Sequence, residues 1–447
     1  MSAELEDAIH RAWVEIDAEP DWAVDLAARL VKIPSVNPKF PAGGDIDIEG
    51  REAEVQDLLE GELTALGLTT RRWDALPGRP NLIAKTEAGG DPARSLILCG
   101  HVDVVPVGDA SAWSWPPFCG EIRDGRLLGR GAQDMKAGLA AAVGAIRAIR
   151  KAGLRLDGQL ALHAVVDEEA GGFGARAAVA EGELAAAAIL AEPGNGEIFL
   201  CQGGLEWLRV TIRGRQGHSA YRYAGYYPQP HAARTGNEPV SAADIATRFL
   251  MALRDFEAGV ARSRSHPLMP AGANHFGVGT VRIGAGMGPD GLPAIMNNPG
   301  IVPDVAVIDI DMKFLPQEKT EEVRAEFEAF VAGFCAADPW LREHPITVAW
   351  ELYGLHFPPQ NTKPDHPLVG ALLSARRRAG HENTTFRSSV GVTDGAHYAA
   401  KGVTALRYGP AGANQHGADE WADVASIRET ARILAAAAIE WCGLGAD

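Results

Sequence analysis

The stretch SLILCGHVDVVP, residues 95–106, decides how the fold is interpreted. Its first part, 95–99, is mostly aliphatic, which is typical of a strand buried on both faces of a parallel sheet. Similar runs follow at 159–166, 186–191 and 403–407, and helix-like stretches occupy 52–66, 135–152, 175–183 and 424–441. Because strand-like and helix-like segments alternate, we expect an α/β fold with a mostly parallel sheet.

A second pattern, with strands that alternate apolar and polar residues, begins near residue 206. Such strands are predicted at 207–213, 275–283, 305–314 and 346–352, with helices at 242–262 and 320–337. The order βαββαβ is that of a ferredoxin-like α+β unit with an antiparallel sheet. We therefore expect a smaller domain at 206–354, inserted into a larger domain made of 1–205 and 355–447.

The charge balance limits the partners. Lys and Arg number 42 against 58 Asp and Glu, a net charge of -16, which argues against binding to nucleic acid or to an anionic membrane. The acidic N-terminus lacks a secretory signal, and no apolar stretch is long enough to span a bilayer. The five scattered cysteines include no CxxC pair. These features predict a cytoplasmic protein.

Residues suited to metal binding follow the predicted strands. They are His101 and Asp103 after the first strand, Glu168 and Glu169 after the second, Glu192 after the third and His416 after the last, with Asp134 just before the helix at 135–152. Taken singly, Asp134 could be a helix N-cap and His101 a hydrogen-bonded core histidine. Together, so many carboxylates at one sheet edge would repel one another without a cation. Imidazole and carboxylate without thiolate suit Zn, Co or Mn.

Two short spacings suggest how the residues divide the work. Asp103 lies two residues after His101, so on an extended segment both side chains point to one face and Asp103 can accept the other ring N–H of His101. Glu168 and Glu169 are adjacent and point differently. One of them can bind metal while the other reaches a water.

These residues carry a resemblance to a known family. HVDVVP (101–106), GRG with DMK (129–136), DEE (167–169), Glu192-Pro193, GHSA (217–220) and the final His416 resemble the acetylornithine deacetylase, succinyl-diaminopimelate desuccinylase and carboxypeptidase G family. The resemblance runs in order from about Val31 to Ile427. It implies a zinc-peptidase-like catalytic domain, and the inserted domain falls where that family has a lid that also forms the dimer.

The resemblance implies a pair of divalent ions, zinc or else cobalt or manganese. Asp134 would bridge both ions, His101 and Glu192 would complete one site, and Glu169 and His416 the other. Glu168 would be the general base for a water held between the ions, and Asp103 the partner of His101. His218, on the lid, would stabilise the oxyanion in its own or the partner subunit of a homodimer.

Two departures from the family concern the substrate. Relatives carry Asn where this chain has Gly300 and Arg where it has Lys313, and those side chains often hold a substrate carboxylate. Lysine is a point charge without the paired donors of Arg. Asn298 and Arg387 are candidates to compensate.

A cluster of aromatic residues follows His218. Tyr221, Tyr223, Tyr226 and Tyr227 could pack a lid loop or an interface, or could form a wall of the substrate site. The sequence leaves these alternatives open.

The predicted function is hydrolysis of an amide bond in a small N-acyl compound, first an N-acyl amino acid, as an acetylornithine deacetylase-like deacylase would do. The alternative within the family is a dipeptidase or carboxypeptidase. The alternative from another class is a binding protein that kept the fold without catalysis.

Overall fold

The computed structural model describes residues 2–40, 50–87, 89–225, 227, 238–383 and 385–445. The chain forms two compact units: Met1–Gln202 with Gln360–Asp447, here called the larger unit, and Gly203–Pro359, here called the inserted unit. The boundaries expected from the sequence, 205/206 and 354/355, lie inside the inserted unit. The reason is that strand β9 (Gly204–Arg213) already begins at Gly204, and β16 (His356–Phe357) pairs with it.

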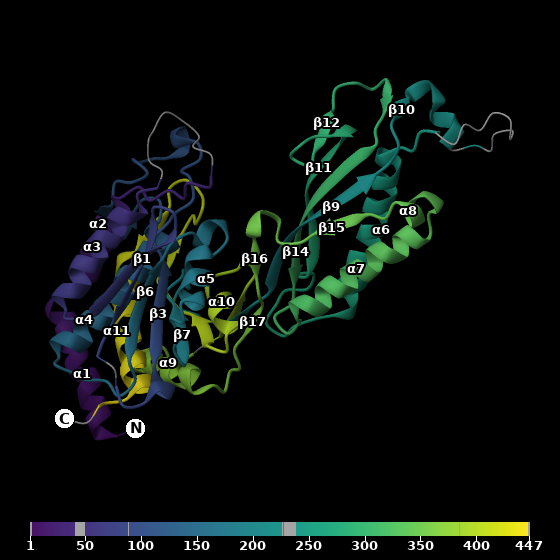
Figure 1. Cartoon of the computed structure of the whole chain (residues 1–447). Coiled ribbons are helices and arrows are strands. Elements are labelled where there is room, and N and C mark those ends of the chain that lie inside the picture. Colours follow the sequence, from purple (N-terminus) through teal and green to yellow (C-terminus); the bar gives the residue numbers. More distant parts are fainter. Residues whose placement is uncertain are drawn as a thin grey trace. The chain divides into compact units, whose positions relative to one another are not determined.

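A mixed sheet forms the centre of the larger unit (Figure 1). The strand order is β1-β2-β6-β3-β7-β19-β8-β17, with β18 beside β8, and the central strands β6, β3, β7 and β19 run parallel. This confirms the predicted α/β fold. The strands are β1 (Thr69–Leu76), β2 (Arg79–Lys85), β3 (Leu96–His101), β6 (Leu160–Val165), β7 (Ala187–Leu190), β8 (Ile198–Gln202), β17 (Gln360–Asn361), β18 (Phe386–Ser389) and β19 (Thr404–Arg407).

Helices cover both faces of this sheet (Figure 1). On one side α4 and α11 pack against β3 and against each other, and their many alanines allow the close approach. On the other side α5 contacts β6, and α10 contacts β7 and β19. The helices are α1 (Ala3–Ala18), α2 (Trp22–Val31), α3 (Glu52–Ala65), α4 (Ala137–Lys151), α5 (Phe173–Ala180), α9 (Pro367–Arg378), α10 (Gly395–Ala399) and α11 (Val424–Cys442).

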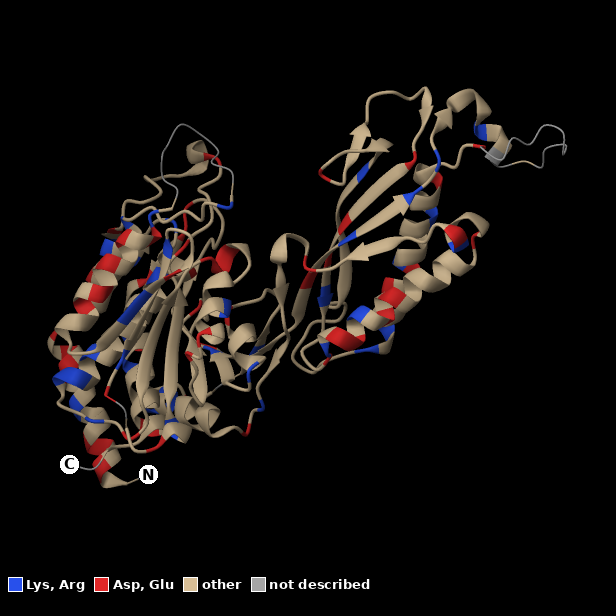
Figure 2. Ribbon diagram, in the orientation of Figure 1, with Lys and Arg blue, Asp and Glu red and all other residues tan. Residues whose placement is uncertain are grey.

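Burial explains why the central strands β3, β6 and β7 are almost entirely apolar, with one histidine each in β3 and β6. β3, β6 and β7 are buried at every position and contain no Asp, Glu, Lys or Arg. Figure 2 shows the charged residues on helices such as α3 instead. A small antiparallel sheet of β4 (Glu121–Arg123), β5 (Arg126–Leu128), β21 (Trp421–Asp423) and β20 (Gly412–Ala413) ties the segment before α4 to the segment before α11.

The inserted unit is an antiparallel sheet with helices on one face. Its strand order is β12-β11-β14-β9-β15, and the element order β9, α6, β11, β14, α7, β15 is the predicted βαββαβ. Side chains of β9 and β14 pack with α6 and α7 around Phe249 and Phe327. The other elements' bounds are β10 (Gly217–His218), α6 (Ala242–Ser263), β11 (His275–Met287), β12 (Pro293–Ile295), β13 (Ile301–Val302), β14 (Val305–Phe314), α7 (Thr320–Ala336), α8 (Pro339–Glu343) and β15 (Thr347–Ala349).

Across the described parts of both units, no helix is both apolar enough and long enough to span a lipid bilayer.

Candidate metal centre and active site

The parallel strands bring the predicted ligands to one edge of the larger unit's sheet. Because β3, β6, β7 and β19 run in the same direction, the segments after their carboxyl ends meet there. The π-helical turn η3 (Ala132–Lys136), which leads into α4, joins them. The side chains gathered in this way are His101, Asp134, Glu168, Glu169, Glu192 and His416.

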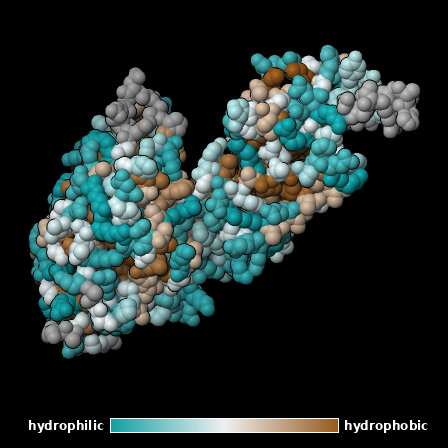
Figure 3. All heavy atoms as spheres, in the orientation of Figure 1, coloured by the Kyte–Doolittle hydropathy of each residue, from teal (hydrophilic) through white to brown (hydrophobic). Residues whose placement is uncertain are grey.

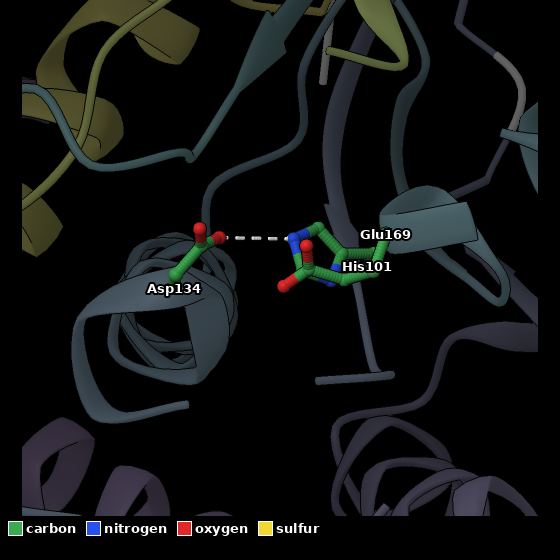
Figure 4. A group of neighbouring side chains, drawn as sticks. All are labelled: His101, Asp134 and Glu169. Atoms are coloured by element: carbon green, nitrogen blue, oxygen red, sulfur yellow. Dashed lines mark hydrogen bonds and ion pairs between the residues drawn. The ribbon is translucent and has the colours of Figure 1, made fainter. Parts of the chain in front are cut away.

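Asp134 lies between two histidines. Its Oδ1 is 3.1 Å from Nε2 of His101 (Figure 4), and its Oδ2 is 3.2 Å from Nε2 of His416. Glu192 Oε1 lies 3.6 Å from His101 Nε2, and Glu169 Oε2 lies 3.0 Å from His416 Nε2. These contacts connect Asp134 to His101 and Glu192 on one side and to His416 and Glu169 on the other.

The simple alternative for Asp134, a helix N-cap, does not match its contacts. No side chain caps the start of η3 or of α4. The Asp134 carboxylate instead turns toward the histidines and accepts a hydrogen bond from the Gln415 side chain. Its buried position therefore serves the cluster rather than the helix end.

Asp103 contacts His101 through an atom that differs from the expected one. Nδ1 of His101 lies 2.9 Å from the backbone oxygen of Asp103 and 3.6 Å from its carboxylate. The carboxylate instead accepts the backbone N–H groups of Glu168 and Glu169, at 3.1 and 3.2 Å, and the side-chain amide of Asn37 at 2.7 Å. Asp103 therefore orients the ring through its main chain and holds the turn of the two glutamates through its side chain.

A buried network of hydrogen bonds and ion pairs supports the turn that carries Glu168 and Glu169. Arg79 binds both oxygens of Glu52, at 2.5 and 2.7 Å, and donates to Asp167 at 2.5 Å. Asp167 has a positive φ of 68°, and Gly171, which ends the turn, has φ 134°, a value that glycine adopts without strain. The network fixes the turn that presents Glu168.

Glu420 is a second support that the sequence analysis missed. Its fully buried carboxylate accepts the backbone N–H groups of Gly131, Gln133 and Asp134, at 3.1, 2.9 and 3.0 Å, and pairs with Arg130. Glu420 follows His416 by four residues, so one carboxylate links two ligand-bearing segments. Glu420 directly precedes strand β21, but this position in the sequence does not reveal that its carboxylate binds the backbone around Asp134, 286 residues earlier.

Burial and repulsion between the carboxylates shift the pKa values of the clustered residues. Burial raises the pKa of Glu168 well above its ordinary value, and burial with Asp134 raises the pKa of Glu192 to about 8 and of Glu169 to about 7. Hydrogen bonds to Asp134 and Glu169 raise the pKa of His416 to about 10. Protons therefore compensate the crowded carboxylates when no cation does so.

These residues fit divalent cations. Oxygen and imidazole donors surround Asp134, and Oε1 of Glu169 is buried without a hydrogen-bond partner among the described residues. Ligand atoms of His101, Asp134 and Glu169 lie within 4.8 Å of one another, as do those of His101, Glu168 and Glu192. A bound cation would favour the charged form of each carboxylate.

The remaining predicted site residues of the inserted unit lie at separate places in it. His218 is exposed on β10, where its Nδ1 accepts the backbone N–H of Ala220 at 3.0 Å. Lys313 lies on β14, 3.8 Å from Asp311. Asn298 uses its side-chain oxygen to accept the N–H of Gly300 at 3.0 Å. Their roles stay predictions.

The tyrosines after His218 are partly described. Tyr221, Tyr223 and Tyr227 are exposed, and the Tyr221 ring lies edge-on to His218 at 6.0 Å. Tyr226 lies outside the described residues. Which of the alternatives these tyrosines serve stays a prediction.

Arg387, the remaining predicted substrate contact, is in the larger unit. It lies on β18 and forms a two-point ion pair with Glu197, at 2.6 and 3.0 Å. Two of its three guanidinium nitrogens, Nε and Nη2, are therefore already engaged.

Comparison with known proteins decides the family. The sequence profile of Peptidase family M20/M25/M40 matches residues 97–440, which span the predicted ligands. The chain belongs to this family. The M20 chain is therefore a hydrolase that acts on amides, and the predicted family resemblance is confirmed.

Relatives of the M20 chain match it from end to end. It is 28% identical to N-formyl-4-amino-5-aminomethyl-2-methylpyrimidine deformylase of Bacillus subtilis, over 98% of this chain and 99% of the relative. It is 29% identical to succinyl-diaminopimelate desuccinylase of Paracidovorax citrulli, over 90% and 93%. Among solved structures, the aminopeptidase PepT of Bacillus cereus shares the fold, with a TM-score of 0.68 and 21% identity over 95% of this chain and 99% of the other.

Proposed function

We propose that the protein is a two-metal deacylase that hydrolyses the amide bond of a small N-acyl compound. The observation that carries the proposal is the pair of ligand groups that share Asp134: His101 with Glu192, and Glu169 with His416. Divalent ions bound there would supply Lewis-acid chemistry, which polarises an amide carbonyl and makes a water more acidic.

Glu168 is the proposed general base. Its side chain is largely buried beside the ligands, with Oε2 3.9 Å from Nε2 of His101, and Asp103 holds its backbone N–H. It takes a proton from the attacking water and returns it to the departing nitrogen, since an amide anion is too poor a leaving group to depart unprotonated. His218 is proposed to stabilise the oxyanion.

An N-acyl amino acid is the first candidate substrate. Lys313 can attract a carboxylate, although with less directionality than the Arg of relatives. A second candidate is an N-formyl aminomethylpyrimidine, which the end-to-end similarity to the deformylase favours.

A substrate panel tests the proposed function. We expect the enzyme loaded with zinc, cobalt or manganese to hydrolyse at least one compound of a panel. The panel holds N-formyl, N-acetyl and N-succinyl amino acids and N-formyl aminomethylpyrimidine, and the released free amine is measured. Dipeptides in the same assay test the peptidase alternative. A fully metal-loaded protein that cleaves none of the N-acyl compounds would contradict the proposal.

We also propose that two chains pair through the inserted unit. β11 is a long strand that, among the described residues, pairs on its outer side only with β12, at Ala285 and Met287. An uncovered strand edge favours pairing with another strand. Val278 and Val281 on β11 are 41% and 42% exposed, and Figure 3 shows hydrophobic surface near the β12 end of this unit.

Light scattering during gel filtration checks the pairing. We expect twice the chain mass for the wild type and a shift toward the single chain for the double variant Val278→Glu, Val281→Glu, because charge on an edge strand opposes pairing. Thr347→Glu, on the edge strand β15 at the other side of the sheet, is the matched control. A wild type that stays a single chain at micromolar concentration and is fully active would refute the dimer.

If His218 acts in the partner's site, mixing two inactive variants restores activity. After His218→Ala and Glu168→Gln dimers exchange subunits, each heterodimer has one site that contains both an intact Glu168 and an intact His218. The absence of recovery despite exchange would place His218 in its own subunit's site.

A further inference from the structure

An arginine that the sequence analysis did not single out lies beside the metal centre. Arg407 is the last residue of β19, next to β7, whose continuation carries Glu192. In register, Arg407 lies opposite Leu190, two residues before Glu192, and opposite Phe199 on β8. The carboxylates that act on the pKa of Arg407, which burial lowers, are those of Glu192, Asp134 and Glu168. The register therefore places Arg407 at the same edge of the sheet as Glu192.

The guanidinium of Arg407 is held in place but little engaged. Its Cζ lies over the Phe199 ring, 3.9 Å from the centroid, in a cation–π contact. Nη1 donates one long hydrogen bond, 3.4 Å, to Oγ of Ser389. Nε is buried and has no hydrogen-bond partner among the described residues, and the structure records no ion pair from Arg407 to any described carboxylate. A charged group with spare donors is costly to bury unless something else binds it.

The neighbouring Arg387 shows the contrast. It lies on β18, with its Cα opposite Phe199, but one edge of its fork, Nε and Nη2, binds Glu197. Among the described residues, Arg387 thus has a carboxylate partner, whereas Arg407, which lies nearer the metal ligands, has none.

We propose that Arg407 binds a carboxylate of the substrate. This inference rests on the proposed function and narrows it to N-acyl compounds that carry an anionic group. A planar, always charged guanidinium can bind both oxygens of a carboxylate, and stacking on Phe199 reduces the freedom lost on binding. The carboxylate can belong to the acyl group, as in a succinyl amide, or to the amine, as in an N-acyl amino acid.

The test compares carboxylate substrates with neutral partners of the same shape. N-succinylbutylamine is paired with N-succinamoylbutylamine for the acyl side, and N-acetylleucine with its amide for the amine side. For whichever carboxylate Arg407 binds, Arg407→Gln should raise KM by about 10- to 100-fold with a smaller change in kcat, because a hydrogen bond to a charged group is lost. The neutral partners should be unaffected. Arg407→Lys should restore only part of the loss, since it keeps the charge but not the planar fork.

A binding measurement makes the inference independent of turnover. Metal-loaded Glu168→Gln, titrated calorimetrically with the same pairs, should bind one carboxylate compound more tightly than its neutral partner, and the added Arg407→Gln should remove that preference. Arg29→Gln, a surface arginine paired with Glu62, is the control for folding and general charge. If wild-type enzyme hydrolyses nothing while this preference exists, the proposed function fails and the inference stands. Equal binding of both members of each pair, or a loss carried by Lys313→Ala or Arg387→Gln instead, overturns the inference.

Discussion

Glu168→Gln is expected to lose about 10²- to 10⁴-fold in kcat and to bind metal as the wild type does. The amide has nearly the size of the carboxylate but cannot take a proton from water. Glu168 is the proposed base rather than one of the five proposed ligands, so metal content should not change. The measurement is kcat at saturating substrate, together with metal analysis of the same preparation.

Glu181→Gln is the matched control for this variant. Glu181 is an exposed carboxylate of the same unit, paired with Arg71, and its loss should leave kcat unchanged. If Glu168→Gln lost metal in proportion to activity, Glu168 would be a ligand rather than the base. Full activity in Glu168→Gln would remove it from the mechanism altogether.

Asp134→Asn is expected to lower metal affinity by more than about 100-fold, because residues that only support a ligand already cost 10- to 100-fold. Asp134 presents one oxygen to His101 and the other to His416, so its loss should affect both ions. Metal analysis should show two ions per wild-type chain and fewer in the variant. The d–d absorption of cobalt-loaded protein reports the same loss without an activity assay.

Asp109→Asn, at an exposed aspartate that bonds to Ser111, is the control for the metal measurement. A wild type that is fully active with a single ion would contradict the shared role of Asp134. An Asp134→Asn chain that still holds two ions would contradict its role as a ligand.

Local sequence was sufficient to predict the central strands and the positions of the metal-type residues. Buried parallel strands must be apolar on both faces, so runs such as 159–166 are visible without a structure, and a polar residue directly after such a run stands out. The helix of the inserted unit predicted at 242–262 is α6, Ala242–Ser263, because its apolar face repeats with the helical period.

Other features depend on residues far apart in the chain. The antiparallel strands β1 and β2 were not predicted. The edge strand β1 has exposed positions that weaken its apolar pattern, and β2, although buried, contains Arg79, Pro80 and Asn81. Glu420, which binds the backbone around Asp134, gives no local sign of its role. Neither does Arg407, which the fold largely buries without a paired carboxylate among the described residues, whereas Arg387 is exposed and pairs with Glu197.

By itself, then, the sequence determined the α/β fold, the inserted βαββαβ unit and the candidate metal ligands. Burial can be inferred from the period of apolar residues, and donor chemistry follows from the residue type. Only the tertiary structure decided which oxygen faces which histidine, that the main chain of Asp103 and not its carboxylate bonds to His101, and which arginine stays unpaired. These depend on distances between segments that the chain brings together from opposite ends. A carboxylate or guanidinium is neutralised by whatever lies within a few ångströms, and that neighbour is set by packing rather than by position in the sequence.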